Sequence, residues 1–174
     1  MATELVLPVE QLDDDPEHYE LLDGRMVRKE SVGRKKHAQL DRIIRSLLVP
    51  FQQKLGGDLE SEWAMINGPD KPIPDVTFSF PNPTLSDGYL VAPAFLVVET
   101  SSKDQSLSSL FRKCRNKYHV FGTPYCWVVD SEEEAAYECH KADNGLFRLV
   151  DTLTAGPDVA LAVSAIFDEL KQQG

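Results

Sequence analysis

The chain has 174 residues, 42% of them hydrophobic, and its 18 Lys and Arg against 28 Asp and Glu give a formal net charge of −10. This length suits one domain with a substantial core and disfavours a second domain. No apolar run approaches the roughly 18–20 residues that span a bilayer, and the first twenty residues lack the basic start of a signal peptide, so we expect a cytoplasmic protein without a membrane partner.

The first third of the chain contains a predicted hairpin and a long predicted helix. Residues 1–18 are acidic and are expected to be flexible, ahead of a single domain over 19–174. Two short runs around an Asp-Gly pair in 19–29 predict a β-hairpin. Apolar residues then recur at helical spacing over 37–55, where Pro50 predicts a kink or a restart and a following Gly-Gly pair ends the helix.

The remainder of the chain predicts three strands, a second helix and a further buried strand. These segments are, in order, 59–66, 73–80, 94–100, 107–121 and 125–130. The strand-helix-strand order at their end predicts a crossover that makes the last strand parallel to 94–100. A hairpin around 142–145 and a short helix over 164–171 complete the chain. We therefore predict a mixed α/β (α+β) fold, a central sheet flanked by helices.

Candidate chemistry rests on carboxylates. The sequence has none of the glycine-rich phosphate loops, nucleophile elbows or H-E-x-x-H motifs that mark nucleotide-binding proteins, hydrolases and zinc proteases. Asp75 follows Pro74 at the start of a predicted strand, and Glu99 ends the most hydrophobic strand. A carboxylate there costs several kcal/mol unless it is paired, hydrogen-bonded or metal-bound. On neighbouring strands the two acids would converge on an oxygen-ligated Mg²⁺ site; the alternative is that each caps a strand at its solvent edge.

The basic side chains gather in two short segments despite the acidic total. Residues 25–45 hold eight of the 18 cations, and residues 112–117 hold four more. Such segments can neutralise the phosphates of a nucleic acid, or they can be solvated helix faces. On the first interpretation the residues that contact nucleic acid are Arg34, Lys35, Lys36, Arg42, Arg112 and Arg115.

Five fragments in order carry a resemblance to a known family. They are YELLDGRMV from Tyr19, His37 at the start of the first helix, PDV, VVETSS, and Tyr118 followed by GTPYCWVVD. Their acids and the lysine-bearing helix have the layout of the PD-(D/E)XK nuclease superfamily. More closely, the chain resembles the Uma-type restriction endonuclease family from about Tyr19 to Phe167. The resemblance implies a restriction-endonuclease-like mixed sheet flanked by helices, and metal-dependent hydrolysis of phosphodiester bonds in DNA.

The same resemblance implies a set of site residues. It makes Asp75 and Glu99 ligands of Mg²⁺, with Mn²⁺ as a substitute and the Thr100 carbonyl as a third ligand. The superfamily's lysine two residues after the second acid is Ser101 here, and the helical lysine that the Uma-type pattern has four residues before its tyrosine is Cys114. The lysines that can replace it are, in order of preference, Lys113, Lys117 and Lys103.

Two further residues are placed near the site by the resemblance. Glu20 is expected near the metal as a third acid or as the anchor of a basic partner. His37 is expected to position water or phosphate, although a lone histidine on an apolar helix face is more often a packed core residue. Ser101 and Lys103 are the remaining neighbours.

Three functions compete on these observations. A metal-dependent DNA endonuclease explains both the buried-strand acid and the clustered cations. A catalytically impaired nucleic-acid-binding or regulatory module on the same fold is favoured by Ser101 and by the net charge of −10. An enzyme that acts on a small phosphorylated or acidic substrate would use the cations as its anion site. Because one site per protomer cuts one strand, an endonuclease that cuts a duplex is expected to be a homodimer.

Overall fold

The computed structural model describes residues 19–29, 35–101 and 105–173. The segment 1–18, which the sequence predicts to be flexible, lies outside these ranges. Among the described helices, none is long and apolar enough to cross a membrane.

The elements follow the predicted order, with additional short hairpins. The central strands are β3 (Asp58–Ser61), β4 (Val76–Ser79), β7 (Leu96–Ser101), β8 (Tyr125–Asp130), β9 (Ala135–His140) and β10 (Phe147–Val150). Three hairpins pair β1 (Tyr19–Leu22) with β2 (Arg25–Arg28), β5 (Leu85–Ser86) with β6 (Tyr89–Leu90), and β11 (Thr152–Ala155) with β12 (Val159–Ala162). The helices are α1 (Lys35–Leu55), α2 (Leu107–Lys113) with its π-helical continuation η3 (Cys114–His119), the short 3₁₀ turn η4 (Lys141–Asp143), and α3 (Val163–Gln172).

The central sheet is mixed. Its strand order is β10-β9-β8-β7-β4-β3. β7 and β8 are parallel, as the crossover through α2 predicts, and the other neighbours are antiparallel. This sheet flanked by helices confirms the predicted fold class.

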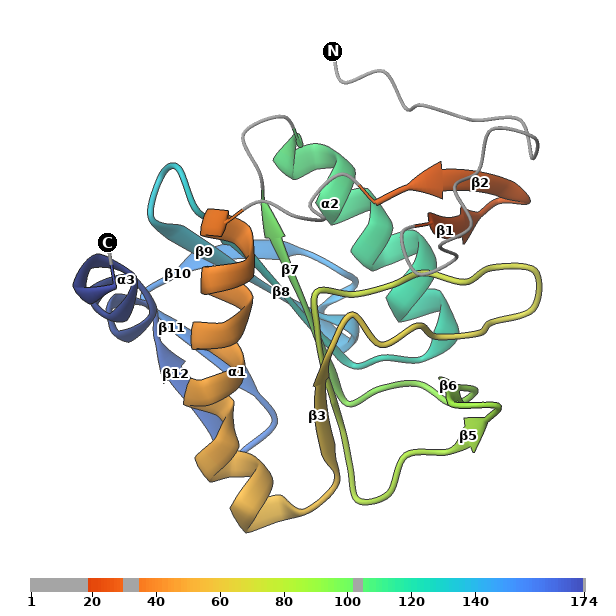
Figure 1. The fold of residues 1–174 in the computed structure, drawn as a ribbon, viewed down its shortest axis with the longest axis horizontal. Coiled ribbons are helices and arrows are strands. Elements are labelled where there is room, and N and C mark those ends of the chain that lie inside the picture. Colours follow the sequence, from red (N-terminus) through yellow and green to blue (C-terminus); the bar gives the residue numbers. More distant parts are fainter. Residues whose placement is uncertain (1–18, 30–34, 102–104, 174) are drawn as a thin grey trace.

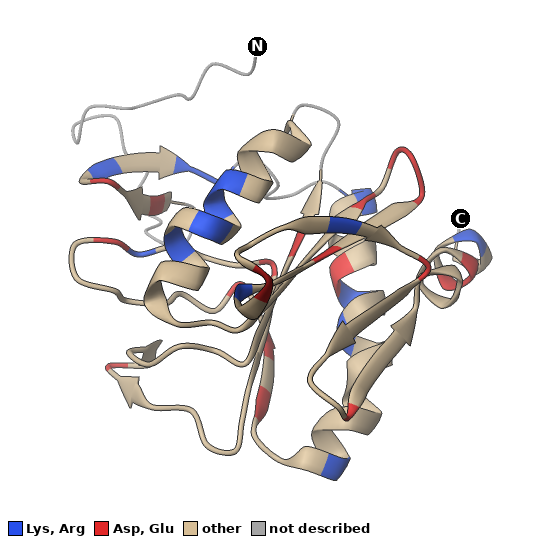
Figure 2. Ribbon diagram, turned by 180° about the vertical axis from the view of Figure 1, so that it is seen from behind, with Lys and Arg blue, Asp and Glu red and all other residues tan. Residues whose placement is uncertain are grey.

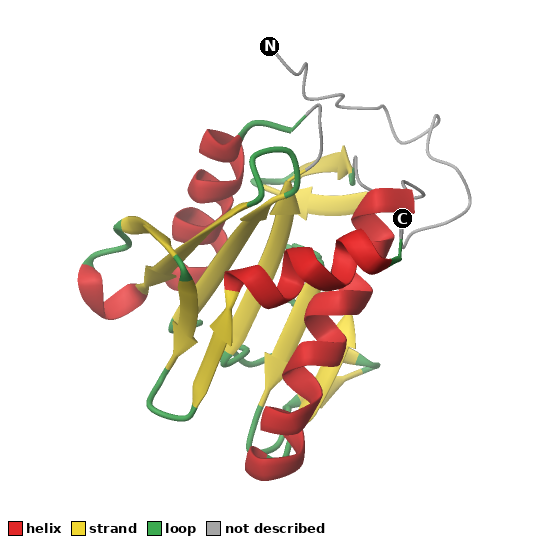
Figure 3. Ribbon diagram, turned by 90° about the vertical axis from the view of Figure 1, so that its left-hand side faces the viewer, coloured by secondary structure: helices red, strands yellow, loops and turns green. Residues whose placement is uncertain are grey.

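The helices form layers on both sides of the sheet. α1 and α3 lie on one side and α2 on the other (Figure 3). Alternate residues of β7 serve the two layers: Leu96 and Val98 pack in the core beneath α1, and Val97 packs in the core beneath α2. The β1–β2 hairpin lies beside α2 and η3, away from α1 and α3 (Figure 1).

Two predicted elements differ from the observed ones. α1 continues through Pro50, so the helix does not restart there. Pro50 has no amide hydrogen to donate to the carbonyl of Ser46. Both residues lie on the exposed face of the helix, where water can bind that carbonyl instead. The strand predicted over 59–66 ends at Ser61, because Glu62 takes a left-handed conformation with φ of 52° that interrupts the ladder.

The turn that ends α1 gives a stability prediction. Gly57 has φ of +83°, and a Cβ atom there would lie 2.2 Å from the Ser79 carbonyl oxygen and 2.5 Å from the Phe80 Cβ. Gly24 has φ of +74°, but nothing lies within 4 Å of its added Cβ. We expect Gly24→Ala to lower the free energy of unfolding by about 1–2 kcal/mol from backbone strain, and Gly57→Ala to lose roughly 1–3 kcal/mol more. Urea titration measures both; equal losses would contradict the close approach.

Candidate active site

Asp75 lies at the point where β4 begins beside β7. The last ladder pair is Val76 with Val98, so Asp75 stands one position beyond it, alongside Glu99 and Thr100. Its side chain is buried, at 1% exposure. Oδ2 accepts hydrogen bonds from the Thr100 amide at 2.7 Å and from the Thr100 hydroxyl at 3.1 Å. The backbone of β7 therefore fixes one of the two carboxylate oxygens.

The other oxygen of Asp75 faces two basic side chains. Lys29 Nζ lies 2.8 Å from Oδ1, and His37 Nε2 lies 3.2 Å from it. Lys29 is also buried, and neither its Nζ nor Asp75 Oδ1 makes an aligned hydrogen bond to the described residues. Burial disfavours the ionised form of Asp75, but Lys29 and His37 outweigh this effect and hold its pKa well below its usual range. The contact is thus an ion pair held by charge rather than by a directed bond.

α1 contributes a histidine and an acid one helical turn apart. His37 Nε2 lies 3.1 Å from Asp41 Oδ2, and its Nδ1 lies 2.7 Å from the Thr100 hydroxyl. Burial opposes charge on His37, but its contacts with the carboxylates of Asp41 and Asp75 raise its pKa to about 10. Burial, together with the negative charge of Asp75, raises the pKa of Asp41. Within the described residues, His37, Asp41 and Asp75 form one group able to hold a metal ion, with ligand atoms within 4.8 Å of one another.

Glu99 faces the opposite side of the sheet from Thr100. Its Oε1 lies 2.8 Å from Lys113 Nζ and accepts a short hydrogen bond from the Tyr118 hydroxyl. Lys113 also pairs with Glu20 Oε1 at 2.7 Å. Burial raises the pKa of Glu99 to about 7 although Lys113 opposes the shift. Burial disfavours charge on Lys113, but Glu20 and Glu99 overcome it and raise the pKa of this lysine.

A π-helical segment aligns Lys113 with Tyr118. These residues are five positions apart, which would place them on different faces of a regular α-helix. The chain from Cys114 to His119 is π-helical, and its i→i+5 bonding brings residues five apart onto one face. The Lys113 ammonium lies 5.7 Å from the centre of the Tyr118 ring, and both side chains reach Glu99. The wider π-helical turn thus lets Lys113 reach Glu99 together with Tyr118, although the position at which the Uma-type pattern has its lysine is Cys114 here.

The donor set fits a divalent cation. Asp75 Oδ1 is a buried carboxylate oxygen without an aligned hydrogen bond to the described residues. Oxygen ligands of this kind suit Mg²⁺ and Mn²⁺. His37 could join such a set only as neutral imidazole, so a cation bound there would replace its proton.

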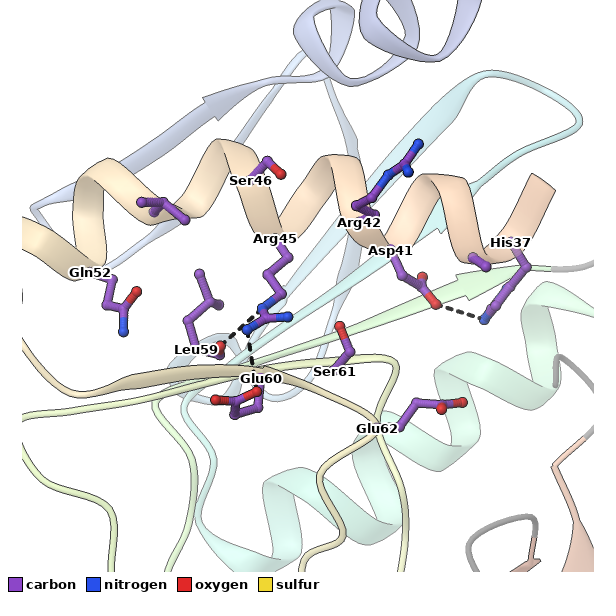
Figure 4. Close-up of a pocket in the computed structure, with 12 residues that line it drawn as sticks. His37, Asp41, Arg42, Arg45, Ser46, Gln52, Leu59, Glu60, Ser61 and Glu62 are labelled. Atoms are coloured by element: carbon purple, nitrogen blue, oxygen red, sulfur yellow. Dashed lines mark hydrogen bonds and ion pairs between the residues drawn. The ribbon is translucent and has the colours of Figure 1, made fainter. Parts of the chain in front are cut away.

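The His37 end of the site opens into a groove between α1 and β3. The groove has a volume of about 450 Å³ (Figure 4). Arg42, Arg45 and Gln52 line it along α1, and Glu60 and Glu62 line it from the β3 side. Arg45 connects α1 to β3 across this groove, because its guanidinium donates to the Leu59 carbonyl at 3.1 Å and to the Glu60 carboxylate at 3.3 Å.

Lys117 and Ser101 have other partners than the acids of the site. Lys117 pairs with Asp23 and Asp70, and so fastens the β1–β2 hairpin to the loop before β4. The Ser101 hydroxyl donates to Asp130 at 3.1 Å. Lys103, the third candidate lysine, lies outside the described residues.

The predicted nucleic-acid contacts are distributed over two helices. Lys35, Lys36 and Arg42 are exposed near the start of α1, where Lys36 pairs with Glu132 at 3.2 Å and Arg42 bonds to Gln173. Arg112 and Arg115 are exposed on α2 and η3, and the ribbon of this helix runs beside β2, which also carries basic residues (Figure 2). Arg115 donates to the Gly145 carbonyl at 2.7 Å. Arg34 lies outside the described residues.

Three residues of the site were not singled out from the sequence. Asp41 had a signal, since it follows His37 by four positions and lies between apolar positions of the helix stripe. Tyr118 was noted for the resemblance but not as a partner of Glu99. Lys29 had no signal that separated it from the other cations of residues 25–45.

Comparison with known proteins agrees with this fold. A crystal structure described as "a putative nuclease belonging to DUF820", from Anabaena variabilis ATCC 29413, is similar with a TM-score of 0.69 over 92% of this chain and 96% of that chain. Because the two sequences are 19% identical, this likeness concerns the fold. No curated protein matches the chain significantly. The model of the Uma2 family, described as "Putative restriction endonuclease", matches residues 5–169. The chain belongs to this family, which confirms the predicted relationship.

The two lysines Lys113 and Lys117, on α2 and η3, differ in the charges that they neutralise. Lys113 lies between the buried acids Glu20 and Glu99, whereas the Asp23 partner of Lys117 is 83% exposed. We expect Lys113→Met to lower the free energy of unfolding by about 3–5 kcal/mol, and Lys117→Met to lower it by less than half as much. Chemical denaturation at neutral pH measures both values. A smaller loss for Lys113→Met than for Lys117→Met would refute this ranking.

Proposed function

We propose that the chain is a metal-dependent endonuclease that hydrolyses phosphodiester bonds of DNA. The observation that carries the proposal is that Asp75 stands opposite Glu99 where β4 begins beside β7, with Lys113 Nζ 2.8 Å from Glu99 Oε1. Membership of the Uma2 family supports the same activity. Two buried acids and a charged lysine where β4 begins and β7 ends could hold a cation and stabilise charge on a phosphate, as metal-assisted phosphodiester cleavage needs.

Asp75 and Glu99 would hold the cation, with the Thr100 carbonyl as a third ligand. His37 and Asp41 offer a second set that shares Asp75. When bound, Mg²⁺ or Mn²⁺ lowers the pKa of a water ligand and offsets negative charge on the phosphate. The Thr100 amide keeps the Asp75 carboxylate in place for either set, because it binds the oxygen opposite the one that faces the site.

Lys113 and Tyr118 have separate tasks in this proposal. The Lys113 ammonium stays charged and lies where it can orient the attacking water and stabilise charge on the phosphate oxygens. Tyr118 holds Glu99 through its hydroxyl and so fixes the direction of that carboxylate. Glu20 accepts from the Ile73 amide at 2.6 Å and anchors the ammonium from the hairpin side.

DNA would approach along the exposed cations and the α1–β3 groove. Lys35, Lys36 and Arg42 flank the end of α1 that carries His37. Their phosphate contacts would supply affinity that is independent of base sequence and sensitive to salt.

A second candidate is a binding or regulatory module on the same fold. Ser101, which stands where the superfamily has its lysine and donates to Asp130, is the observation that favours it. This module would bind DNA through the same cations but would leave it intact, with or without Mg²⁺.

Cleavage of supercoiled plasmid, linear duplex and single-stranded DNA with Mg²⁺ or Mn²⁺ tests the proposal. We expect the wild type to cut at least one substrate, and Asp75→Asn and Lys113→Met to be at least 10²-fold slower, since each removes a charge that acts on the reacting groups. Lys54→Met, which removes an exposed cation at the far end of α1, is the control that should retain activity. If the wild type cuts none of these substrates but still binds DNA, the binding module is favoured.

Two further variants, tested in the same cleavage assay, separate the two ligand sets. Glu99→Gln should abolish metal-dependent cutting if Asp75 and Glu99 form the set, whereas Asp41→Asn should do so if His37 and Asp41 complete it. Titration of cleavage rate against Mn²⁺ concentration reports which variant requires more metal.

The proposed DNA contacts predict a change in salt dependence. Exchange of both Lys35 and Lys36 for Gln should weaken duplex binding and make the slope of log affinity against log salt shallower by about 2 units, because each phosphate contact contributes about 0.9. Asp75→Asn, with its cations intact, should keep the wild-type slope. Fluorescence anisotropy from low to moderate salt measures both; an unchanged slope in the double variant would exclude these lysines as contacts.

A further inference from the structure

Lys29 has a position that the proposed mechanism leaves unused. It follows β2 directly, and its side chain is only 4% exposed. A fully buried ammonium is costly unless it has an ionised partner, and here the partner at 2.8 Å is Asp75 Oδ1. This is the same oxygen that the proposed metal site needs, because Oδ2 is already bound to Thr100.

The Lys29 contact is of a kind that another cation can replace. Lys29 Nζ makes no aligned hydrogen bond to the described residues, so Asp75 Oδ1 is held there by charge and not by direction. A divalent ion offers the same oxygen a higher charge and a direct bond. An ammonium 2.8 Å from this oxygen repels a divalent ion that binds the same atom, so the ion and the Lys29 contact compete.

Glu62 provides an alternative partner for the ammonium. Its Oε1 lies 3.7 Å from Lys29 Nζ, its side chain is 52% exposed, and it lines the groove between α1 and β3. The Glu62 amide donates to the Asp75 backbone carbonyl at 3.1 Å, which keeps the two acids side by side. Lys29 therefore lies between a buried acid and an exposed one, and a shift toward Glu62 would free Asp75 Oδ1.

We infer that Lys29 occupies the cation position of Asp75, and that a divalent ion binds there by displacing its ammonium toward Glu62. The inference rests on the metal site of the proposed function. It assigns Lys29 as a positioning residue that keeps the site formed without metal and sets the metal concentration at which the site fills.

Mn²⁺ binding, measured by calorimetry and by the paramagnetic resonance of the free ion without DNA, tests this exchange. Lys29→Met removes the competitor and should lower the Mn²⁺ dissociation constant roughly tenfold, the order of effect that one close charge has on an ionised group. Glu62→Gln removes the second resting place and should raise that constant. In the double variant Lys29→Met with Glu62→Gln, the effect of Glu62→Gln should largely vanish.

Each alternative outcome has a distinct meaning. An unchanged or higher dissociation constant in Lys29→Met, at full folding, overturns the inference. If Lys29→Met does not fold, Glu62→Gln is the deciding variant, because the Glu62 side chain is exposed and its replacement should not affect folding. Unchanged Mn²⁺ affinity in Glu62→Gln would also overturn the inference. If Glu62→Gln still raises the Mn²⁺ dissociation constant when Lys29 is already replaced by Met, Glu62 attracts the ion directly. That result would overturn the exchange.

Two controls separate this inference from the proposed function. Lys54→Met changes the net charge by the same amount far from the site and should leave Mn²⁺ affinity unchanged. Asp75→Asn should abolish the binding. If the wild type binds no Mn²⁺, the metal site of the proposed function fails; if it binds Mn²⁺ through Asp75 but Lys29→Met binds no more tightly, only the exchange fails.

Discussion

The buried carboxylate of Asp75 is the constraint on which the rest of the site depends. An ionised acid at 1% exposure requires partners on every side, and its two oxygens have partners of different kinds. The backbone and hydroxyl of Thr100 hold Oδ2, while Lys29 and His37 neutralise Oδ1. The two Thr100 groups fix the position of the carboxylate. Lys29 and His37 hold Oδ1 by charge, and this is the oxygen at which we propose that a divalent ion replaces the ammonium.

The alternation of side chains along β7 divides the site between the two faces of the sheet. Thr100 faces α1 and meets His37 and Asp41, whereas Glu99 faces α2 and meets Lys113. The β1–β2 hairpin connects the halves, because Glu20 on β1 contacts Lys113 and Lys29 after β2 contacts Asp75. The hairpin is therefore part of the site and not a peripheral feature.

Much of the fold could be predicted because its signals are local. The Asp-Gly hairpin, the end of α1 at Gly56 and the buried strand β8 follow from turn chemistry and periodicity. Asp75 and Glu99 could be identified as candidates because an acid at the end of an apolar strand needs a reason to be there. The short β5–β6 and β11–β12 hairpins were not predicted, because two to four residues show too little alternation.

The sequence ranked Lys113 ahead of Lys117, but helical spacing places both at the edge of one apolar stripe and does not explain why only one of them contacts Glu99. The π-helical turn after Lys113 changes that spacing, directs Lys113 to Glu99, and leaves Lys117 with Asp23 and Asp70. Asp41 follows His37 by one helical turn, but its place in the site, like that of Lys29, depends on contacts across the fold that periodicity does not report. The central claim is that Asp75 Oδ1 is the anchor of a divalent metal site. Anomalous diffraction from crystals soaked in Mn²⁺ tests it most directly. We expect an anomalous peak about 2–2.5 Å from Asp75 Oδ1, with the Lys29 ammonium moved away from that oxygen. The absence of a peak, with Lys29 still in contact with Asp75, would contradict this claim.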